Sequence, residues 1–171
     1  DQFNQTGSPI SREIKTRIEN LFEAPGEGAD HAVSVMAGEL NQLFRMDSEW
    51  THEWLMPVLS FDHHFAEPLW SGLLNRQCPS DPELIAILKP HLLVLFPWVE
   101  QFSWDNEIIQ NGAEWLMRIR LFHSDRNYNL TSTEIRNVLR SMTETTRNHC
   151  ISLLALAGQS NENGWVKHVI P

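Results

Sequence analysis

Residues 84–99 read Leu84-Ile-Ala-Ile-Leu-Lys-Pro-His-Leu-Leu-Val-Leu-Phe-Pro-Trp-Val99, and this stretch decides the fold class. Its larger apolar residues recur at the spacing of one helix face, namely Leu84, Leu88, Leu92, Leu95, Phe96 and Val99. Between His91 and Pro97 the run is apolar without a break, which is typical of a helix covered on several sides. The run is too short to span a bilayer. We therefore expect a core helix, divided into two or three pieces by Pro90 and Pro97, with shorter amphipathic helices packed around it.

Helices are also predicted on the N-terminal side of this stretch. Ser8 followed by Pro9 is a typical helix start, and an apolar stripe follows it at Ile10, Ile14, Ile18, Leu21 and Phe22. Asp30 is expected to cap a second helix that carries Val33, Met36, Leu40, Leu43 and Phe44 on its buried side. Gly38 lies inside that pattern, where its small size would allow close packing. Asp47 or Ser48 is expected to cap a third helix, which Pro57 ends early or kinks.

The C-terminal half shows the same helical spacing. Asp81 or Ser80 is expected to cap the core helix, Asp105 a long helix through Phe122, and Thr131 or Ser132 the next helix. A further helix is predicted from Thr143 to Gly158, and a short final one from Trp165. The tetrapeptide Glu-Trp-Leu-Met occurs twice, at 53–56 and 114–117, which is a weak indication of repetition because the flanking residues do not align.

No stretch alternates apolar and polar residues over the length of a strand. We therefore predict an all-α fold of eight to ten short helices, arranged as a helical bundle or as a solenoid of stacked helical hairpins. Residues 1–8 are polar and are expected to be flexible, and residues 9–171 are expected to form a single α-helical domain. Because the chain begins without Met and stops within an apolar run, we interpret it as a fragment of a longer protein.

Charge is unevenly distributed along the chain, whose net charge is −9. Residues 31–117 contain twelve acidic and three basic side chains, whereas residues 118–147 contain six arginines and three acidic side chains. The overall acidity disfavours a general nucleic-acid binder or a protein of anionic membranes, because both need a basic surface. Cys78 and Cys150 match no metal or redox spacing, and they are interpreted as reduced thiols of a cytoplasmic protein.

Recognisable catalytic and metal-binding motifs are absent from the sequence. The sequence contains no nucleophile elbow, no glycine-rich phosphate loop and no dinucleotide fingerprint, so no residue is assigned a catalytic role and no cofactor is expected. Asp62, His63 and His64, together with His52 and Glu53, are the best candidates for a metal-dependent enzyme. Against this alternative, no His-x-x-x-His pair occurs, and adjacent side chains point apart in a regular helix or strand.

The arginines at 118–147 are the most informative polar feature. Arg136, Arg140 and Arg147 recur at intervals of four and seven, so they would share a face if their helices ran on as one. Such a face could meet an acidic partner, a nucleic-acid backbone or the acidic half of the same protein. The simpler interpretation is a solvated face with ion pairs to Glu134 and Glu144. Trp98 and Trp104, next to proline and in a polar setting, are the tryptophans most expected to be exposed for partner binding.

Several short motifs together resemble one group of proteins. Trp70-Ser-Gly-Leu-Leu, Leu88-Lys-Pro, Arg136-Asn-Val-Leu-Arg and 163–171 resemble the helical region near the C-terminus of large bacterial anti-phage defence proteins, some of which carry an N-terminal sirtuin-like NAD-consuming domain. The resemblance covers about residues 60–171. It implies a helical-repeat sensor or scaffold domain, with any enzyme elsewhere in the polypeptide.

The resulting hypothesis is a non-catalytic, cytoplasmic interaction domain of a larger bacterial protein. Its partner would be another protein or other domains of the same polypeptide, with an oligomer as one form of such contact. The residues expected to make this contact are Arg136, Arg140, Arg147, Trp98 and Trp104. The alternatives are a metal-dependent enzyme built around Asp62–His64 and a nucleic-acid-contacting domain that uses the 118–147 arginines.

Overall fold

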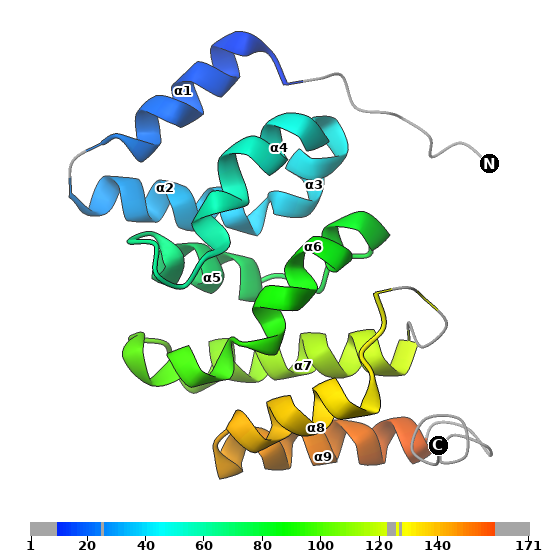
Figure 1. The fold of residues 1–171 in the computed structure, drawn as a ribbon. Helices are drawn as coiled ribbons and strands as arrows, with labels where there is room; N and C mark the ends of the chain where they lie inside the picture. The colour runs from blue at the N-terminus through cyan, green and yellow to red at the C-terminus, as the bar shows by residue number, and fades with distance from the viewer. Residues whose placement is uncertain (1–9, 25, 123–125, 127, 160–171) are drawn as a thin grey trace. The chain divides into compact units, whose positions relative to one another are not determined.

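The computed structural model describes residues 10–24, 26–122, 126 and 128–159. Within these residues the chain is all-α, with nine α-helices, two short 3-10 helices and no strand. In chain order these are α1 (Arg12–Phe22), α2 (Glu27–Gly38), α3 (Leu40–Met46), α4 (Ser48–Leu55), η1 (Pro57–Leu59), α5 (Ala66–Leu74), α6 (Pro82–Leu93), η2 (Phe96–Gln101), α7 (Asn106–Phe122), α8 (Ser132–Ser141) and α9 (Glu144–Gln159) (Figure 1). None of the described helices is both long enough and apolar enough to cross a bilayer.

Contacts between residues divide the chain into two compact units, Asp1–Leu84 and Ile85–Pro171. The boundary falls inside α6. The net charge divides sharply between them, because unit 1 contains fourteen acidic and five basic residues, whereas unit 2 contains eight of each. The expectation of a single domain over 9–171 stays a prediction, as does the choice between bundle and solenoid. The expected flexible segment 1–8 and the expected final helix from Trp165 lie outside the described residues.

Unit 1 is built on the contact between α2 and α5, the most extensive between any two of the described helices. A close approach of the two backbones makes this contact possible. A Cβ atom added to Gly72 in α5 would overlap the backbone of Ser34 in α2, lying 2.6 Å from its carbonyl carbon. Gly38 faces the same region, where an added Cβ would lie 3.5 Å from the Gly72 carbonyl oxygen. The prediction that Gly38 serves close packing is confirmed, and Gly72 is the more constrained of the two.

An apolar cluster and an ion pair join α1 to α4 in unit 1. Buried Ile10, Ile18 and Trp50 form an apolar cluster, and half-buried Phe22 and Trp54 pack against it. The Lys15 ammonium of α1 forms an ion pair with the Asp47 carboxylate, with 2.5 Å between Nζ and Oδ2. The same carboxylate accepts a hydrogen bond from the backbone N–H of Trp50 and so caps α4. The Lys15 ammonium and this N–H hold the pKa of Asp47 below its usual value, against the opposing effect of partial burial.

Unit 2 contains α7 and α9, which pack along each other, and α8, which contacts η2 (Figure 1). Lys89 of α6 anchors the start of α8. Its ammonium donates to the Asn129 carbonyl at 2.8 Å and pairs with the Glu134 carboxylate at 3.0 Å. The core stretch that suggested the fold class is buried as expected, since none of its six apolar positions is more than 8% exposed.

Most of the predicted helix starts are confirmed. Asp47 caps α4, Thr131 forms a capping box with Glu134 at α8, and Asp105 accepts the N–H of Ile108 at 2.9 Å. Asp81 accepts the N–H groups of Glu83 and Leu84 at the start of α6. These predictions succeed because capping depends on residues within one turn of the chain.

Other boundaries differ from the prediction. The helix start expected at Ser8 and Pro9 lies outside the described residues, within which Ser11 caps α1. The second helix, α2, begins after Gly26, whose φ of +70° suits glycine, so that Asp30 lies inside the helix. The helix expected from Asp30 to Phe44 is divided at Glu39 into α2 and α3. Pro90 does not divide α6, which continues to Leu93, whereas Pro97 does mark the change to η2.

The expected apolar stripe of α1 is also only partly buried. Ile14 and Leu21 are about half exposed, at 51% and 48%, whereas Ile18 is 8% exposed. An amphipathic pattern predicts which residues share a side of the helix, but it does not fix how wide a strip the neighbouring helices cover.

Candidate partner-binding site

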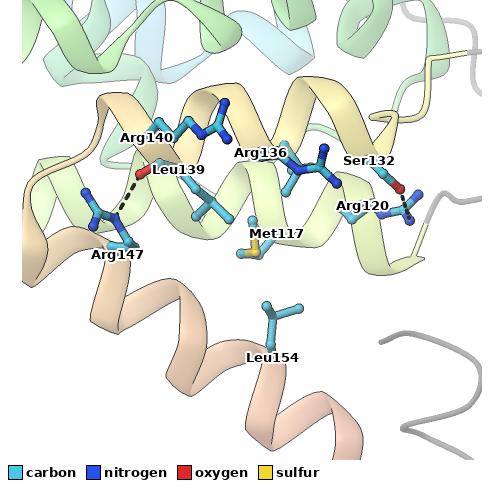
Figure 2. Close-up of a pocket in the computed structure, with 9 residues that line it drawn as sticks. Met117, Arg120, Ser132, Arg136, Leu139, Arg140, Arg147 and Leu154 are labelled. Atoms are coloured by element: carbon cyan, nitrogen blue, oxygen red, sulfur yellow. Dashed lines mark hydrogen bonds between the residues drawn. The ribbon is translucent and has the colours of Figure 1, made fainter. Parts of the chain in front are cut away.

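A groove in unit 2 brings together the arginines that the sequence singled out. Arg136 and Arg140 of α8 and Arg147 of α9 line it, and Arg120 of α7 completes a set of four guanidinium groups (Figure 2). The groove has a volume of about 500 Å³, and its other lining residues are Met117, Ser132, Ile135, Leu139 and Leu154. The three predicted arginines therefore share one surface although α8 and α9 are separate helices.

Two of the four arginines hold α8 in place. Arg120 donates to the Leu130 carbonyl at 3.1 Å and to the Ser132 hydroxyl at 3.4 Å, next to the capped start of α8. Arg147 donates to the Leu139 and Met142 carbonyls, each at 2.9 Å, and so satisfies backbone acceptors at the other end of α8. Figure 2 shows these two side chains at opposite ends of the groove.

Arg136 and Arg140 lie between these ends and have a different role. Both are exposed, and within the part of the chain that the structure describes neither makes a hydrogen bond or an ion pair. The expected pairing of the arginines with Glu134 is wrong, because the Glu134 carboxylate bonds to Lys89 and to the Thr131 N–H instead. Partial burial raises the pKa of Glu134, but the bonds to Thr131 and Lys89 outweigh it and leave this pKa below its usual value.

The floor of the groove is apolar. Met117 is 2% exposed, and Ile135, Leu139 and Leu154 are half-buried. No acidic side chain occurs among the described residues that line the groove, so its four positive charges are not neutralised from within it. A guanidinium group presents several donors in a fixed plane that matches a carboxylate. The arrangement therefore suits a ligand or chain segment with both carboxylates and apolar groups.

The two predicted tryptophans lie elsewhere in unit 2. Trp98 belongs to η2 and Trp104 follows it, and neither lines the groove. Both are half-buried, and the Trp104 ring packs against Phe102 with 4.7 Å between ring centroids. They are less buried than Trp50, Trp70 and Trp115, as expected, although Trp54 is half-buried like them. The structure does not bring Trp98 and Trp104 together with the arginines.

The histidine cluster of unit 1 does not assemble a metal centre within the described residues, where no three His, Cys, Asp or Glu side chains converge on one point. His63 and His64 do not point apart as expected, since their rings stack with centroids 4.4 Å apart. The expectation assumed a regular helix or strand, whereas these residues lie in a turn. Burial, with a smaller effect of His64, lowers the pKa of His63.

Of the arginines that line the groove in the described part of the chain, Arg120 is the one that was not assigned to the partner-binding site from the sequence. It belongs to the arginine-rich segment, but it lies on a different helix and out of register with the later arginines.

Comparison of the chain with protein-family models, with curated proteins and with solved structures finds no significant match. The resemblance to sirtuin-associated defence proteins therefore stays a prediction.

Proposed function

We propose that this chain is an interaction module that binds an acidic, partly apolar segment of a partner protein through the arginine groove of unit 2. The observation that carries the proposal is that Arg136 and Arg140 are exposed over an apolar floor and have no partner in the described part of the chain. An amphipathic helix laid in such a groove would bury its apolar residues against Met117 and Leu139. Its carboxylates would meet the two arginines.

Two further features favour a protein partner over nucleic acid. The groove floor is apolar, which adds nothing to contact with a phosphate backbone, and unit 2 has no net positive charge. Arg120 and Arg147 are held by bonds to α8, so the groove is organised before a partner arrives. This preorganisation reduces the ordering cost of binding. If the resemblance to defence proteins holds, the partner would be a phage component or another domain of the same polypeptide.

The test is a fluorescence-anisotropy titration of the full chain with a labelled amphipathic peptide that has leucine on one face and glutamate along its flanks. Binding should weaken as salt is added, and a peptide with lysine in place of glutamate should not bind. Arg136→Glu or Arg140→Glu should each weaken binding about fivefold or more, the equivalent of an exposed ion pair worth about 1 kcal/mol. Arg12→Glu, which makes the same charge change at an exposed position of α1, is the matched control.

The outcomes separate the alternatives. Equal binding of the glutamate and lysine peptides, or charge reversals at 136 and 140 that act no more strongly than the control, would refute the proposal. Binding of duplex DNA in the same assay, lost steeply with salt and with Arg136→Glu, would replace it with the nucleic-acid alternative. A stoichiometric transition metal in the purified protein would favour the metal-dependent enzyme.

A further inference from the structure

Unit 1 contains a second groove, of about 500 Å³, that differs in chemistry from the arginine groove. Aromatic rings from three different segments line it, namely Phe22 at the end of α1, Trp54 in α4 and Phe65 just before α5. The Phe22 ring centroid lies 5.4 Å from that of Trp54 and 6.3 Å from that of Phe65. All three side chains are half-buried, so their rings form a continuous wall that remains partly open to solvent.

A carboxylate stands beside this wall. Glu53 lines the groove and is exposed, and it has no hydrogen bond or ion pair within the described residues. The reason is local, because the position one turn further on is Pro57, which offers no charge. In the second copy of the tetrapeptide, Glu114 is followed one turn later by Arg118 and pairs with it at 2.7 Å. Glu53 therefore has no oppositely charged partner among the described residues.

Among the remaining described lining groups, only His63 and His64 are able to carry a positive charge. Lysine and arginine are absent from the described lining, and unit 1 carries the whole net charge of −9. His63 also lines the groove, and its Nδ1 accepts the backbone N–H of Phe65 at 3.2 Å, so that nitrogen carries no proton. Burial, assisted by His64, lowers the pKa of His63, which favours the same neutral form.

We propose that this aromatic groove binds a small organic cation with a quaternary ammonium head group. Such a group is too weakly hydrated to need hydrogen bonds, and it is attracted to the faces of aromatic rings within about 6 Å, best of all to tryptophan. Trp54, Phe22 and Phe65 supply those faces, and Glu53 supplies the compensating charge. The groove volume lies within the range of about 300–1,000 Å³ that is typical of small-molecule sites.

Choline and its uncharged carbon isostere dimethylbutanol are the probes, because they have the same shape and differ in charge. In an NMR titration of the full chain, choline should shift the Trp54 indole resonance with a dissociation constant on the order of 1 mM. The dissociation constant of the isostere should be at least about fivefold larger than that of choline. Choline that binds no better than the isostere, or that leaves the Trp54 resonance unchanged up to about 20 mM, would overturn the proposal.

Variants assign the effect to the groove. Glu53→Gln should weaken choline binding about threefold or more and leave binding of the isostere unchanged. Glu27→Gln removes the same charge at an exposed position of α2 that does not line the groove, and it should change neither. Trp54→Leu should reduce choline binding more than isostere binding. Because Trp54 also packs on the apolar cluster, the Glu53→Gln result stands on its own if this variant fails to fold.

Discussion

Replacing Gly72 with alanine should destabilise unit 1 although alanine is the better helix former. Gly72 lies in α5 where that helix crosses α2, and the added methyl group would overlap the Ser34 carbonyl. It would also lie 2.6 Å and 2.8 Å from the Ser34 carbonyl carbon and Cα, whereas carbon atoms in contact lie about 3.5–4.0 Å apart. Backbone atoms in a helix cannot relieve the overlap by changing rotamer as a side chain can, so α2 and α5 must separate by about 1 Å.

The magnitude follows from two opposing contributions. Glycine to alanine inside a helix favours folding by about 1 kcal/mol through backbone entropy. Overpacking a dense interface costs about 1–3 kcal/mol, and a separation of 1 Å also removes up to about half of the dispersion energy of the neighbouring contacts. Those contacts involve the most buried faces of the unit, since Val33, Ala37, Leu69 and Leu73 are each at most 2% exposed. The net expectation is a loss of about 2 kcal/mol or more, or roughly 10 °C in Tm for a unit of this size.

Urea unfolding followed by circular dichroism measures this loss, with two other glycines of the same unit as controls. Gly28 in α2 has open space around the position of an added Cβ, so Gly28→Ala should be neutral or should stabilise by up to about 1 kcal/mol. For Gly38→Ala the nearest atom is the Arg76 Nε at 3.1 Å, in an exposed side chain that can move, so its effect should lie between the other two. Equal stability of Gly72→Ala and Gly28→Ala would refute the close approach of α2 and α5.

Three further results are expected. Asp47→Ala should destabilise the protein by about 1–2 kcal/mol in urea unfolding, because it removes both the α4 cap and the partner of Lys15. Because the folded-state pKa of Asp47 is depressed, its contribution to stability should be full above the unfolded pKa near 3.8 and lost as pH falls through the folded pKa. An unchanged dependence of stability on acidic pH in Asp47→Asn would contradict this expectation. Burial raises the pKa of Cys150 to about 11, so in a Cys78→Ser variant the remaining thiol should react with a disulfide reagent at neutral pH only after the protein unfolds. Rapid labelling of the folded variant would contradict this expectation, because it would show that Cys150 is accessible. Thr131→Ala should cost about 1 kcal/mol of stability in the same urea assay and should also weaken binding of the acidic peptide, because the capping box fixes the start of the helix that carries Arg136 and Arg140. Thr133→Ala, at an exposed position of the same helix turn, is the control and should change neither stability nor binding.

The all-helical fold class could be predicted because its signals are local. Apolar spacing over Leu84–Val99 depends only on the period of a helix, and the caps at Asp47, Asp105 and Thr131 depend on the next three residues. The division of the second helix at Glu39 could not be predicted in this way. The close approach of α2 to α5 could not be predicted either, because it depends on Gly72, which lies more than thirty residues further along the chain than Glu39.

Three of the four arginines that line the candidate groove were singled out from the sequence, but the geometry of the groove was not predicted, and Trp98 and Trp104 do not line it. The interval of four between Arg136 and Arg140 places them on one face of α8 from sequence alone. Arg147 was expected to join them only if α8 and α9 were continuous. The structure brings it to the same groove by a turn after Met142, which Arg147 itself stabilises by donating to the Met142 carbonyl. Arg120 required knowledge of which helix packs beside α8, and no single-sequence pattern contains that information.

The two Glu-Trp-Leu-Met tetrapeptides show most directly why repetition of sequence did not predict a repeated function. In both copies the leucine is buried, Leu55 at 1% and Leu116 at 0% exposure, because each lies on the apolar side of its helix. The other positions differ because the following residues differ. In the first copy Pro57 follows the end of α4, Trp54 is half-buried, and Glu53 has no partner among the residues that the structure describes. In the second copy α7 continues, Trp115 and Met117 are buried, and Arg118 pairs with Glu114. Glu53 and Trp54 of the first copy thus line the aromatic groove of unit 1, whereas Met117 of the second copy lines the arginine groove of unit 2. The residue one turn further along decides whether the glutamate is paired, since Arg118 pairs with Glu114 and Pro57 offers Glu53 no charge.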